Sequence, residues 1–325
     1  MRSTFSPCSI ARDSLVILTV IVEEGRQRPP IAPHALLLEG PILPFLGVKQ
    51  TIMALSFTLK QTSPVPLEVE GITPDQLVGK SVAEIEKLEM FHGNVKTPLG
   101  EFFRIEGDSA DQVHHWHGNL EGVHWLGTKM TSGKVEVHSN IGRHVGGEMR
   151  GGEIVVHGNA GDWVGGEMHG GLIRILGNAG HLVGSAYRGS PKGMTKGTIL
   201  VHGNVGNEVG HSLRRGLIAV GGNSGDLMGM NMLAGSIFVF GNGGIRHGAG
   251  MKRGTIAFLG SEHPPVLPTF RKSATFKPDF LQVLFRHLRR LEFPIAQELF
   301  ISAYDLYCGD LLEGGRGELL LRTLA

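Results

Sequence analysis

Histidine is the residue type in this sequence with the widest chemical capacity, because imidazole binds metal ions and exchanges protons near neutral pH. The chain has 16 histidines. Two groups of histidines could come close in space. One is an outward row on successive strands, His117, His138 and His157, in which Leu176 takes the next position and His202 the one after it. The other is a local group, His114, His115 and His124. No carboxylate recurs with them at ligand spacing, and stacked repeats align like residues for packing reasons alone. The sequence therefore predicts no metal site.

Other motifs that resemble catalytic or cofactor-binding sites have simpler explanations. The Gly-x-Gly-x-x-x-Gly runs recur with the repeat, and none opens a helix or precedes the Gly-Lys-Ser/Thr of a phosphate-binding loop. Asp108 and Asp111 are the only paired carboxylates in a suggestive turn, and we expect them to cap a helix. No Ser–His–Asp or Cys–His combination stands out. We predict no catalytic residues, and a cofactor-binding site stays unassigned.

Composition and charge narrow the function classes. The chain of 325 residues is 41% hydrophobic, enough for a substantial core, and its net charge of +1 offers no basic footprint for nucleic acid. Its two cysteines, Cys8 and Cys308, are far apart, which favours a reducing, cytoplasmic setting over an iron–sulfur or structural zinc site. The apolar run from Leu15 to Val22 is too short to span a bilayer. We expect neither nucleic acid nor a membrane as a partner.

A repeat with a period near 19 residues organises the middle of the chain, where most of the 49 glycines lie. Asn140, Asn159 and Asn178, which mark successive repeats, are 19 residues apart. Alternation sends two residues of each repeat to one face: Val135/Val137, Ile154/Val156, Ile173/Ile175, Ile199/Val201, Ile218/Val220, Ile237/Val239 and Ile256/Phe258. Each repeat can bury that face only against its neighbours. We predict a mainly β fold: a single-stranded right-handed parallel β-helix of about seven rungs.

The residues between the strands have predictable roles in such a coil. Glycines are expected at turns with positive φ, and the repeat asparagines are expected to hydrogen-bond along the axis. An apolar side chain follows each asparagine by nine residues and is expected to plug the interior: Met149, Met168, Tyr187, Leu213, Met232 and Met251. The extra residues from Arg188 to Met194 predict a loop at one edge, which is either a tolerated insertion or a contact surface.

The composition divides the chain into four segments. Residues 1–52 show no repeat and are interpreted as a non-native or disordered extension, with Met53 as the biological start. Residues 53–112 are expected to form an α+β cap, with a strand from Met53, a helix begun by the Ser81–Glu84 capping box, and a strand over Glu101–Ile105. Residues 113–262 hold the repeat. Residues 263–325 are interpreted as a helical tail.

The outward positions of the late repeats are too apolar to face water: Leu200, Ala219, Phe238, Phe240, Ala257 and Leu259. The tail offers a cover, since Asp279 to Phe293 has the pattern of an amphipathic helix. Its predicted apolar face is Phe280, Leu284, Leu288 and Leu291, and its predicted polar face is Arg286, His287, Arg289 and Arg290. A second helix is expected from Ala296 to Tyr304. We predict that the first helix covers part of the apolar face and turns its arginines toward a partner.

The repeat resembles a known family. Written as Gly-x2-Met-x2-Gly-x-Ile-x-Val-x-Gly, the unit occurs at 127–139, 146–158, 165–177, 191–203, 210–222, 229–241 and 248–260, with Ser139 and Pro191 in place of Gly and Leu213 in place of Met. It is similar to the repeat of the C-type subunit of formylmethanofuran dehydrogenase, and to the C-terminal β-helix domain of the large glutamate synthase polypeptide. The segments Phe103–Asp108 and Tyr307–Glu318 resemble the formylmethanofuran dehydrogenase type.

The resemblance implies a non-catalytic scaffold subunit in one of two complexes. A tungsten or molybdenum enzyme fixes carbon dioxide onto methanofuran; the formyltransferase/hydrolase complex converts formyl-tetrahydromethanopterin to formate through a methanofuran-type carrier in formaldehyde oxidation. Arginine outnumbers lysine by 19 to 12, which favours a GC-rich bacterium and the hydrolytic complex. The implied partners are amidohydrolase, formyltransferase and B-type subunits. This chain is expected to bind no cofactor, with the metal on another subunit.

Overall fold

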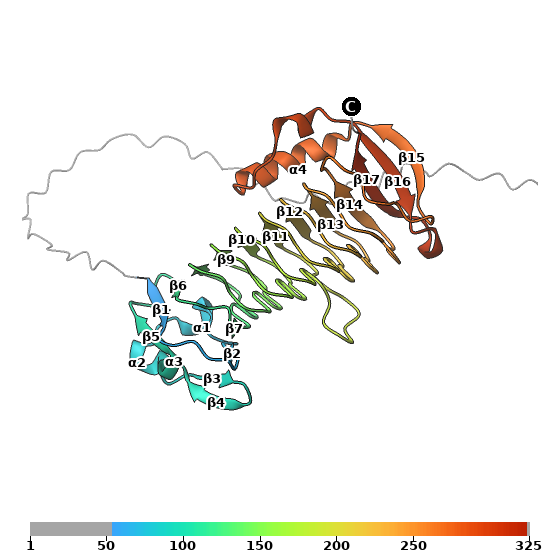
Figure 1. Ribbon diagram of the computed structural model, residues 1–325. Coiled ribbons are helices and arrows are strands. Elements are labelled where there is room, and N and C mark those ends of the chain that lie inside the picture. Colours follow the sequence, from blue (N-terminus) through green and yellow to red (C-terminus); the bar gives the residue numbers. More distant parts are fainter. Residues whose placement is uncertain (1–53, 324–325) are drawn as a thin grey trace, which may run out of the picture. The chain divides into compact units, whose positions relative to one another are not determined.

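The computed structural model describes residues 54–323, so the expectation for residues 1–52 lies outside the described part of the chain. The fold is mainly β, as predicted. One large sheet of 13 strands, mostly parallel, has the order β15-β16-β17-β14-β13-β12-β11-β10-β9-β8-β6-β1-β5 (Figure 1). A second sheet has the order β4-β3-β2-β7. No helix within residues 54–323 is both long and apolar enough to cross a bilayer.

The repeat forms the parallel centre of the large sheet. Its strands are β8 (Lys134–Val137), β9 (Glu153–Val156), β10 (Leu172–Ile175), β11 (Thr198–Val201), β12 (Leu217–Val220), β13 (Ser236–Val239) and β14 (Gly254–Phe258). Equivalent residues pair directly, so Ile154 lies beside Ile173 and Ile173 beside Ile199. A second row of isolated parallel bridges follows the same period, as between Ala160 and Ala179. The sequence period therefore sets the strand register.

The predicted inward pairs form the core, and every one of them is buried. Glycine is favoured beside them, because Gly165 has a φ of 62° and a Cβ there would lie 2.4 Å from the Cδ1 atom of Ile199. The predicted methionine plugs are buried too, with one correction. Met194, and not Tyr187, fills the interior in the repeat that carries the insertion. The inserted residues delay the plug, so a count of nine from the asparagine selects the wrong residue there.

The turns use asparagine as predicted and non-glycine residues in a way that was not predicted. The Asn140 Oδ1 atom accepts a hydrogen bond from the Asn159 backbone N–H at 2.8 Å, and the pattern continues along the row to Asn242. In most repeats two turn positions hold non-glycine residues with positive φ, for example Trp163 at 57° and Glu167 at 53°. Such residues are strained outside a supporting structure, and here the stacked backbone hydrogen bonds supply that support.

The N-terminal part has the expected strand–helix–strand pattern with different bounds. Its elements are β1 (Leu55–Leu59), β2 (Leu67–Glu68), α1 (Pro74–Leu77), α2 (Val82–Ile85), β3 (Glu89–His92), β4 (Val95–Pro98), α3 (Leu99–Phe102), β5 (Phe103–Glu106), β6 (Val113–His117) and β7 (Val123–His124). The Ser81–Glu84 capping box is present. The helix that it starts is only one turn long, because residues from Glu89 pair as a strand with β4. The predicted strand over Glu101–Ile105 begins only at Phe103.

The prediction of a helical tail is wrong in part. The segment contains β15 (Arg271–Phe276), α4 (Asp279–Arg290), a 3-10 turn η2 (Gln297–Phe300), β16 (Tyr304–Gly309), a 3-10 turn η3 (Leu311–Glu313) and β17 (Gly317–Arg322). β17 pairs in parallel with β14, and β16 and β15 extend the sheet in antiparallel order. These strands satisfy the backbone groups that β14 would otherwise leave unpaired at the sheet edge. The expected second helix is the turn η2.

Helix α4 covers the late outer face, as predicted, through a partly different set of residues: Leu288 is buried as expected, and Leu284 and Leu291 pack against the buried cluster. Leu281, Phe285 and Leu288 of α4 are buried in one cluster with Phe238 of β13 and its neighbours Leu200, Ala219, Ala257 and Leu259. Phe280, which was expected on the buried side, is 46% exposed. The helix carries apolar residues on a broad arc, and the contact with the sheet decides which stripe is buried.

Candidate functional site

The outer face of the large sheet is the surface that distinguishes one repeat from the next. One row across it runs through paired residues: His115, Glu136, Val155, Arg174, Leu200, Ala219, Phe238, Ala257 and Leu320. The row is polar at its N-terminal end and apolar at its C-terminal end. We call the outer face of β6, β8 and β9 the open half, and the face beneath α4, on β11–β14 and β17, the covered half.

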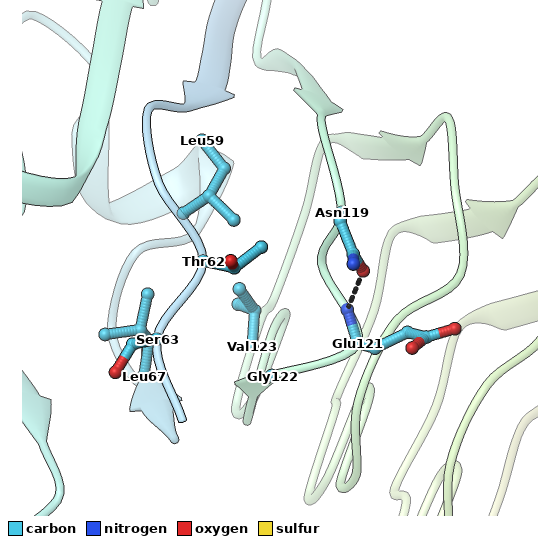
Figure 2. A pocket seen from close by; sticks show the side chains of 8 residues that line it. All are labelled: Leu59, Thr62, Ser63, Leu67, Asn119, Glu121, Gly122 and Val123. Atoms are coloured by element: carbon cyan, nitrogen blue, oxygen red, sulfur yellow. Dashed lines mark hydrogen bonds between the residues drawn. The ribbon is translucent and has the colours of Figure 1, made fainter. Parts of the chain in front are cut away.

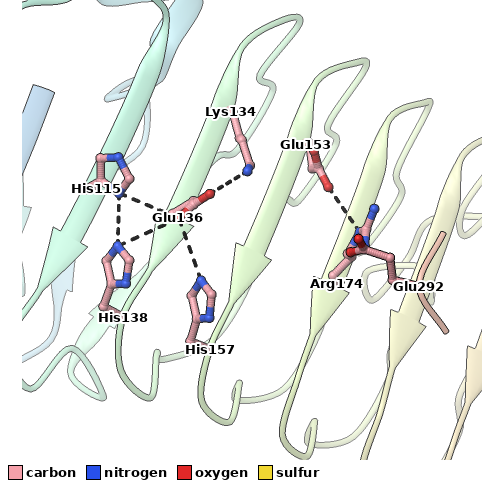
Figure 3. Close-up of polar contacts among 8 residues, drawn as sticks. All are labelled: His115, Lys134, Glu136, His138, Glu153, His157, Arg174 and Glu292. Atoms are coloured by element: carbon pink, nitrogen blue, oxygen red, sulfur yellow. Dashed lines mark hydrogen bonds and ion pairs between the residues drawn. The ribbon is translucent and has the colours of Figure 1, made fainter. Parts of the chain in front are cut away.

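Three imidazoles of the open half converge on one carboxylate oxygen (Figure 3). The Oε2 atom of Glu136 lies 3.7 Å from Nδ1 of His115, 3.9 Å from Nε2 of His138 and 3.8 Å from Nε2 of His157. Two of the imidazoles approach each other as well, with 3.0 Å between Nδ1 of His115 and Nε2 of His138. In-register pairing of β6 with β8 places His115 directly beside Glu136.

The charge state of this cluster follows from its surroundings. Lys134 forms an ion pair with the second oxygen of Glu136, and the pKa of this carboxyl is lowered mainly by that hydrogen bond. The pKa of His138 is lowered by partial burial first and by the neighbouring imidazoles next. Glu136 is therefore ionised and His138 neutral near pH 7.

The structure brings together three of the four histidines of the predicted row. His117 and His138 stack with ring centres 4.5 Å apart, and His138 and His157 with centres 5.1 Å apart. His202 belongs to the covered half, where its ring meets the edge of Phe293 at 5.1 Å. Of the local group, His115 joins the cluster, whereas His114 is buried, and burial lowers its pKa to about 4.

Glu136 is the residue that sequence reasoning missed. The expectation that no carboxylate accompanies the histidines at ligand spacing is wrong, because His115, Glu136 and His138 place one potential ligand atom each within 4.8 Å of one another. His115 and Glu136 are 21 residues apart, whereas most of the later repeats are 19 residues apart, so a fixed period does not align them. Knowing that β6 pairs with β8 would have revealed the pair.

A shallow pocket of about 190 Å³ lies between the N-terminal part and the first repeat (Figure 2). Leu59, Ser63 and Asn119 are among its lining residues. The Ser63 hydroxyl hydrogen-bonds to Nε2 of His92 at 2.8 Å and accepts the Val65 N–H at 3.0 Å. A serine–histidine pair is the beginning of a nucleophilic site, but activation also needs a group that orients the imidazole. Here the ring of His92 packs against Phe102, with ring centres 4.8 Å apart.

The predicted edge loop borders a second hollow of about 270 Å³, lined by residues that include Trp163, Tyr187 and His211. Beside it, Trp125 and His144 stack with centres 3.9 Å apart, and Tyr187 packs over both rings. Burial lowers the pKa of His144 to about 4, so its ring is neutral. This aromatic stack offers a flat apolar surface and no arrangement for acid–base chemistry.

The predicted carboxylate pair has a structural role. The Oδ1 atom of Asp108 accepts the Ala110 N–H at 2.6 Å, and that of Asp111 accepts the Val113 N–H at 2.9 Å. Both contacts stabilise turns. The expectation of a helix cap is wrong in detail, because the strand β6 and no helix follows these residues.

No protein-family model matches the chain. Its fold is similar to a chain of the formyltransferase/hydrolase complex from Methylorubrum extorquens, solved in complex with methylofuran: the TM-score is 0.75 at 29% identity, over 83% of this chain and 100% of that chain. The resemblance predicted from the repeat is confirmed.

Curated relatives, of which two are examples, match a shorter part of the chain. It is 43% identical over 88 residues to the C-type subunit of molybdenum-containing formylmethanofuran dehydrogenase 1 from Methanothermobacter thermautotrophicus. It is 42% identical over 93 residues to the C-type subunit of tungsten-containing formylmethanofuran dehydrogenase 2 from Methanothermobacter wolfeii. Each match covers 27% of this chain, and the chain spans only 22% and 34% of these relatives.

Proposed function

We propose that this chain is a structural, non-catalytic subunit of a formyltransferase/hydrolase complex that converts formyl-tetrahydromethanopterin to formate through a formyl-methanofuran-type carrier in formaldehyde oxidation. The observation that carries the proposal is the fold similarity, which extends over the whole of one chain from a solved complex of that name. The partners in this proposal are amidohydrolase, formyltransferase and B-type subunits in the cytoplasm. The furan carrier, the pterin and the catalytic metal belong to those subunits.

The architecture we propose for this role is a right-handed parallel β-helix of seven rungs over residues 113–262, with a cap over 53–112. The in-register ladder of β8–β14 and the second row of bridges at the same period support it. A coil with a fixed core and a variable outer face suits a scaffold, because each outer side chain can change without loss of the interior.

The alternative to the hydrolytic complex is formylmethanofuran dehydrogenase, which catalyses a redox reaction. The curated relatives belong to molybdenum and tungsten formylmethanofuran dehydrogenases, which favours a C-type subunit of that redox enzyme. A structural β-helix like that of glutamate synthase is a third candidate. The metal content of the native assembly separates the first two, since only the dehydrogenase contains tungsten or molybdenum.

The proposed role is tested by activity measured on two samples. The assembly purified from its native cell is expected to release formate from formyl-tetrahydromethanopterin, whereas the purified full chain alone is expected to release none above the blank. Formate release by the isolated chain at a rate comparable with the assembly would refute the non-catalytic role. An assembly that contains tungsten or molybdenum would establish the alternative.

A further inference from the structure

The cluster around Glu136 contains the donor set of a metal-binding site. Two imidazole nitrogens and a carboxylate oxygen are ligands that zinc and other divalent first-row cations accept. They come from β6 and β8 and from the residue that follows β8, three positions that face the same side of the sheet. A third imidazole, that of His157, lies next to the same oxygen from the residue that follows β9.

The distances agree with ligands arranged around one cation. With zinc–ligand bonds of about 2.0 to 2.1 Å, neighbouring donors in a tetrahedral site are about 3.3 Å apart. The three separations among His115 Nδ1, Glu136 Oε2 and His138 Nε2 are 3.0, 3.7 and 3.9 Å. The two longer ones exceed a hydrogen bond, so direct hydrogen bonding does not account for the convergence of the imidazoles on Glu136 Oε2.

The repeat itself does not account for the cluster. Stacking of like residues explains the row His117, His138 and His157, which belongs to equivalent positions of successive strands. It does not explain His115 and Glu136, because the positions that follow them in their row are Val155, Arg174 and Leu200. The two side chains that convert a histidine row into a ligand set are thus particular to the first strands.

The site is also accessible to a cation. Lys134 pairs with the Oε1 atom of Glu136, so Oε2 is the oxygen that remains for a cation. Glu136 retains 20% of its side-chain exposure and His115 30%, so solvent and a small ion can reach the site.

We propose that His115, Glu136 and His138 bind one divalent transition-metal cation, with His157 within reach as a fourth ligand. Zinc is the cation whose ligand distances are compared with the site and the one used in the test. The bound ion joins β6 to β8 and to the residue that follows β9. It acts as a cross-link between the first strands of the sheet and takes no part in the formyl chemistry. This inference revises the sequence-based expectation of no metal site, and it does not depend on the proposed function.

Titration of the full chain with zinc chloride tests the proposal. After removal of metals with a chelator, calorimetry is expected to show one saturable site with a dissociation constant in the micromolar range or below. Glu136→Gln and His138→Ala are each expected to weaken binding more than about tenfold. The matched control is His169→Ala, at an exposed histidine whose Nδ1 contacts the Thr195 hydroxyl. It is expected to bind zinc as the wild type does.

A second readout separates binding from folding. Zinc is expected to raise the thermal midpoint of the wild type and of His169→Ala, and to raise that of Glu136→Gln clearly less, because stabilisation of the native state falls with the affinity of the ligand. Glu136→Gln preserves side-chain size, so it decides the matter even if His138→Ala folds poorly. Absence of a saturable site in the wild type, or unchanged zinc affinity in Glu136→Gln and His138→Ala, would overturn the proposal.

Discussion

The open half and the covered half of the outer sheet face are built on the same repeat and have opposite character. Both rest on the same inward rows, which consist mostly of buried Ile and Val side chains. In the covered half, Phe238 and its neighbours are sealed by Leu281, Phe285 and Leu288 of α4. In the open half, partly exposed His138 and Glu136 stand in equivalent rows. The interior thus fixes the fold, and the outer side chains are free to differ.

Arg174 marks the boundary between the two halves. Its guanidinium forms ion pairs with Glu153 on β9 and with Glu292, which follows α4, and it donates a hydrogen bond to the Leu291 carbonyl at 2.9 Å. The end of α4 is therefore attached to the strand at which the outer row changes from polar to apolar. The comparison implies that substitutions in the covered half affect stability and those in the open half affect binding.

The largest effect is expected from Phe238→Asp. The substitution removes a buried aromatic ring that is 1% exposed and places an unpaired charge beneath α4, so the free energy of unfolding should fall by more than about 4 kcal/mol. The control is Leu176→Asp, at a position on the same sheet face that is 41% exposed, where a change within about 0.5 kcal/mol is expected. Thermal and denaturant unfolding measure both. Equal changes in the free energy of unfolding at the two positions would mean that α4 does not bury Phe238 in the native protein.

A smaller effect is expected from Arg174→Met, which keeps the apolar stem and removes the guanidinium. Loss of its charged hydrogen bonds should lower the free energy of unfolding by about 1.5 to 3 kcal/mol, because the side chain is only 16% exposed. Glu292→Gln is the matched change on the partner. Since Glu292 is 83% exposed, its effect should stay within about 0.5 kcal/mol. If Arg174→Met leaves the free energy of unfolding unchanged in denaturant unfolding, Arg174 does not stabilise the attachment of the end of α4 to the sheet.

The smallest effect concerns pH in the covered half. The pKa of His202 is lowered by burial first and by Arg174 next. Below its ordinary pKa of about 6.5, the unfolded chain then binds more protons at this residue than the folded chain, so stability falls as pH is lowered and is fully present above that pH. His202→Gln should flatten this part of the stability–pH curve measured by thermal unfolding. An unchanged slope would show that His202 is not responsible.

The sequence predicted the features that repeat and missed the features that occur once. Ile154 and Val156 could be placed in the core because the same pattern returns every 19 residues. The strand β15 could not be found, since all six of its residues are exposed and it lacks the alternation that marks a half-buried strand. The buried stripe of α4 was predicted only in part: Phe280 and Leu281 are adjacent apolar residues, and only the contact with the sheet selects Leu281 for burial.

Only part of the candidate site could be predicted from the sequence, for a similar reason. The row His117, His138 and His157 follows from the repeat, whereas the contact of His115 with Glu136 depends on an irregular first interval and on strand pairing. The proposal that the chain belongs to an enzyme complex rests on its resemblance to known subunits, because no set of catalytic residues could be identified in the sequence.

The most direct test of the central claim, that this chain is a structural subunit of a formyltransferase/hydrolase complex, is to identify what it binds in its native cell. Affinity purification of the full chain followed by mass spectrometry is expected to recover amidohydrolase, formyltransferase and B-type subunits in constant proportion. Recovery of the chain alone, or with amidotransferase and flavin subunits of a glutamate synthase, would contradict the account.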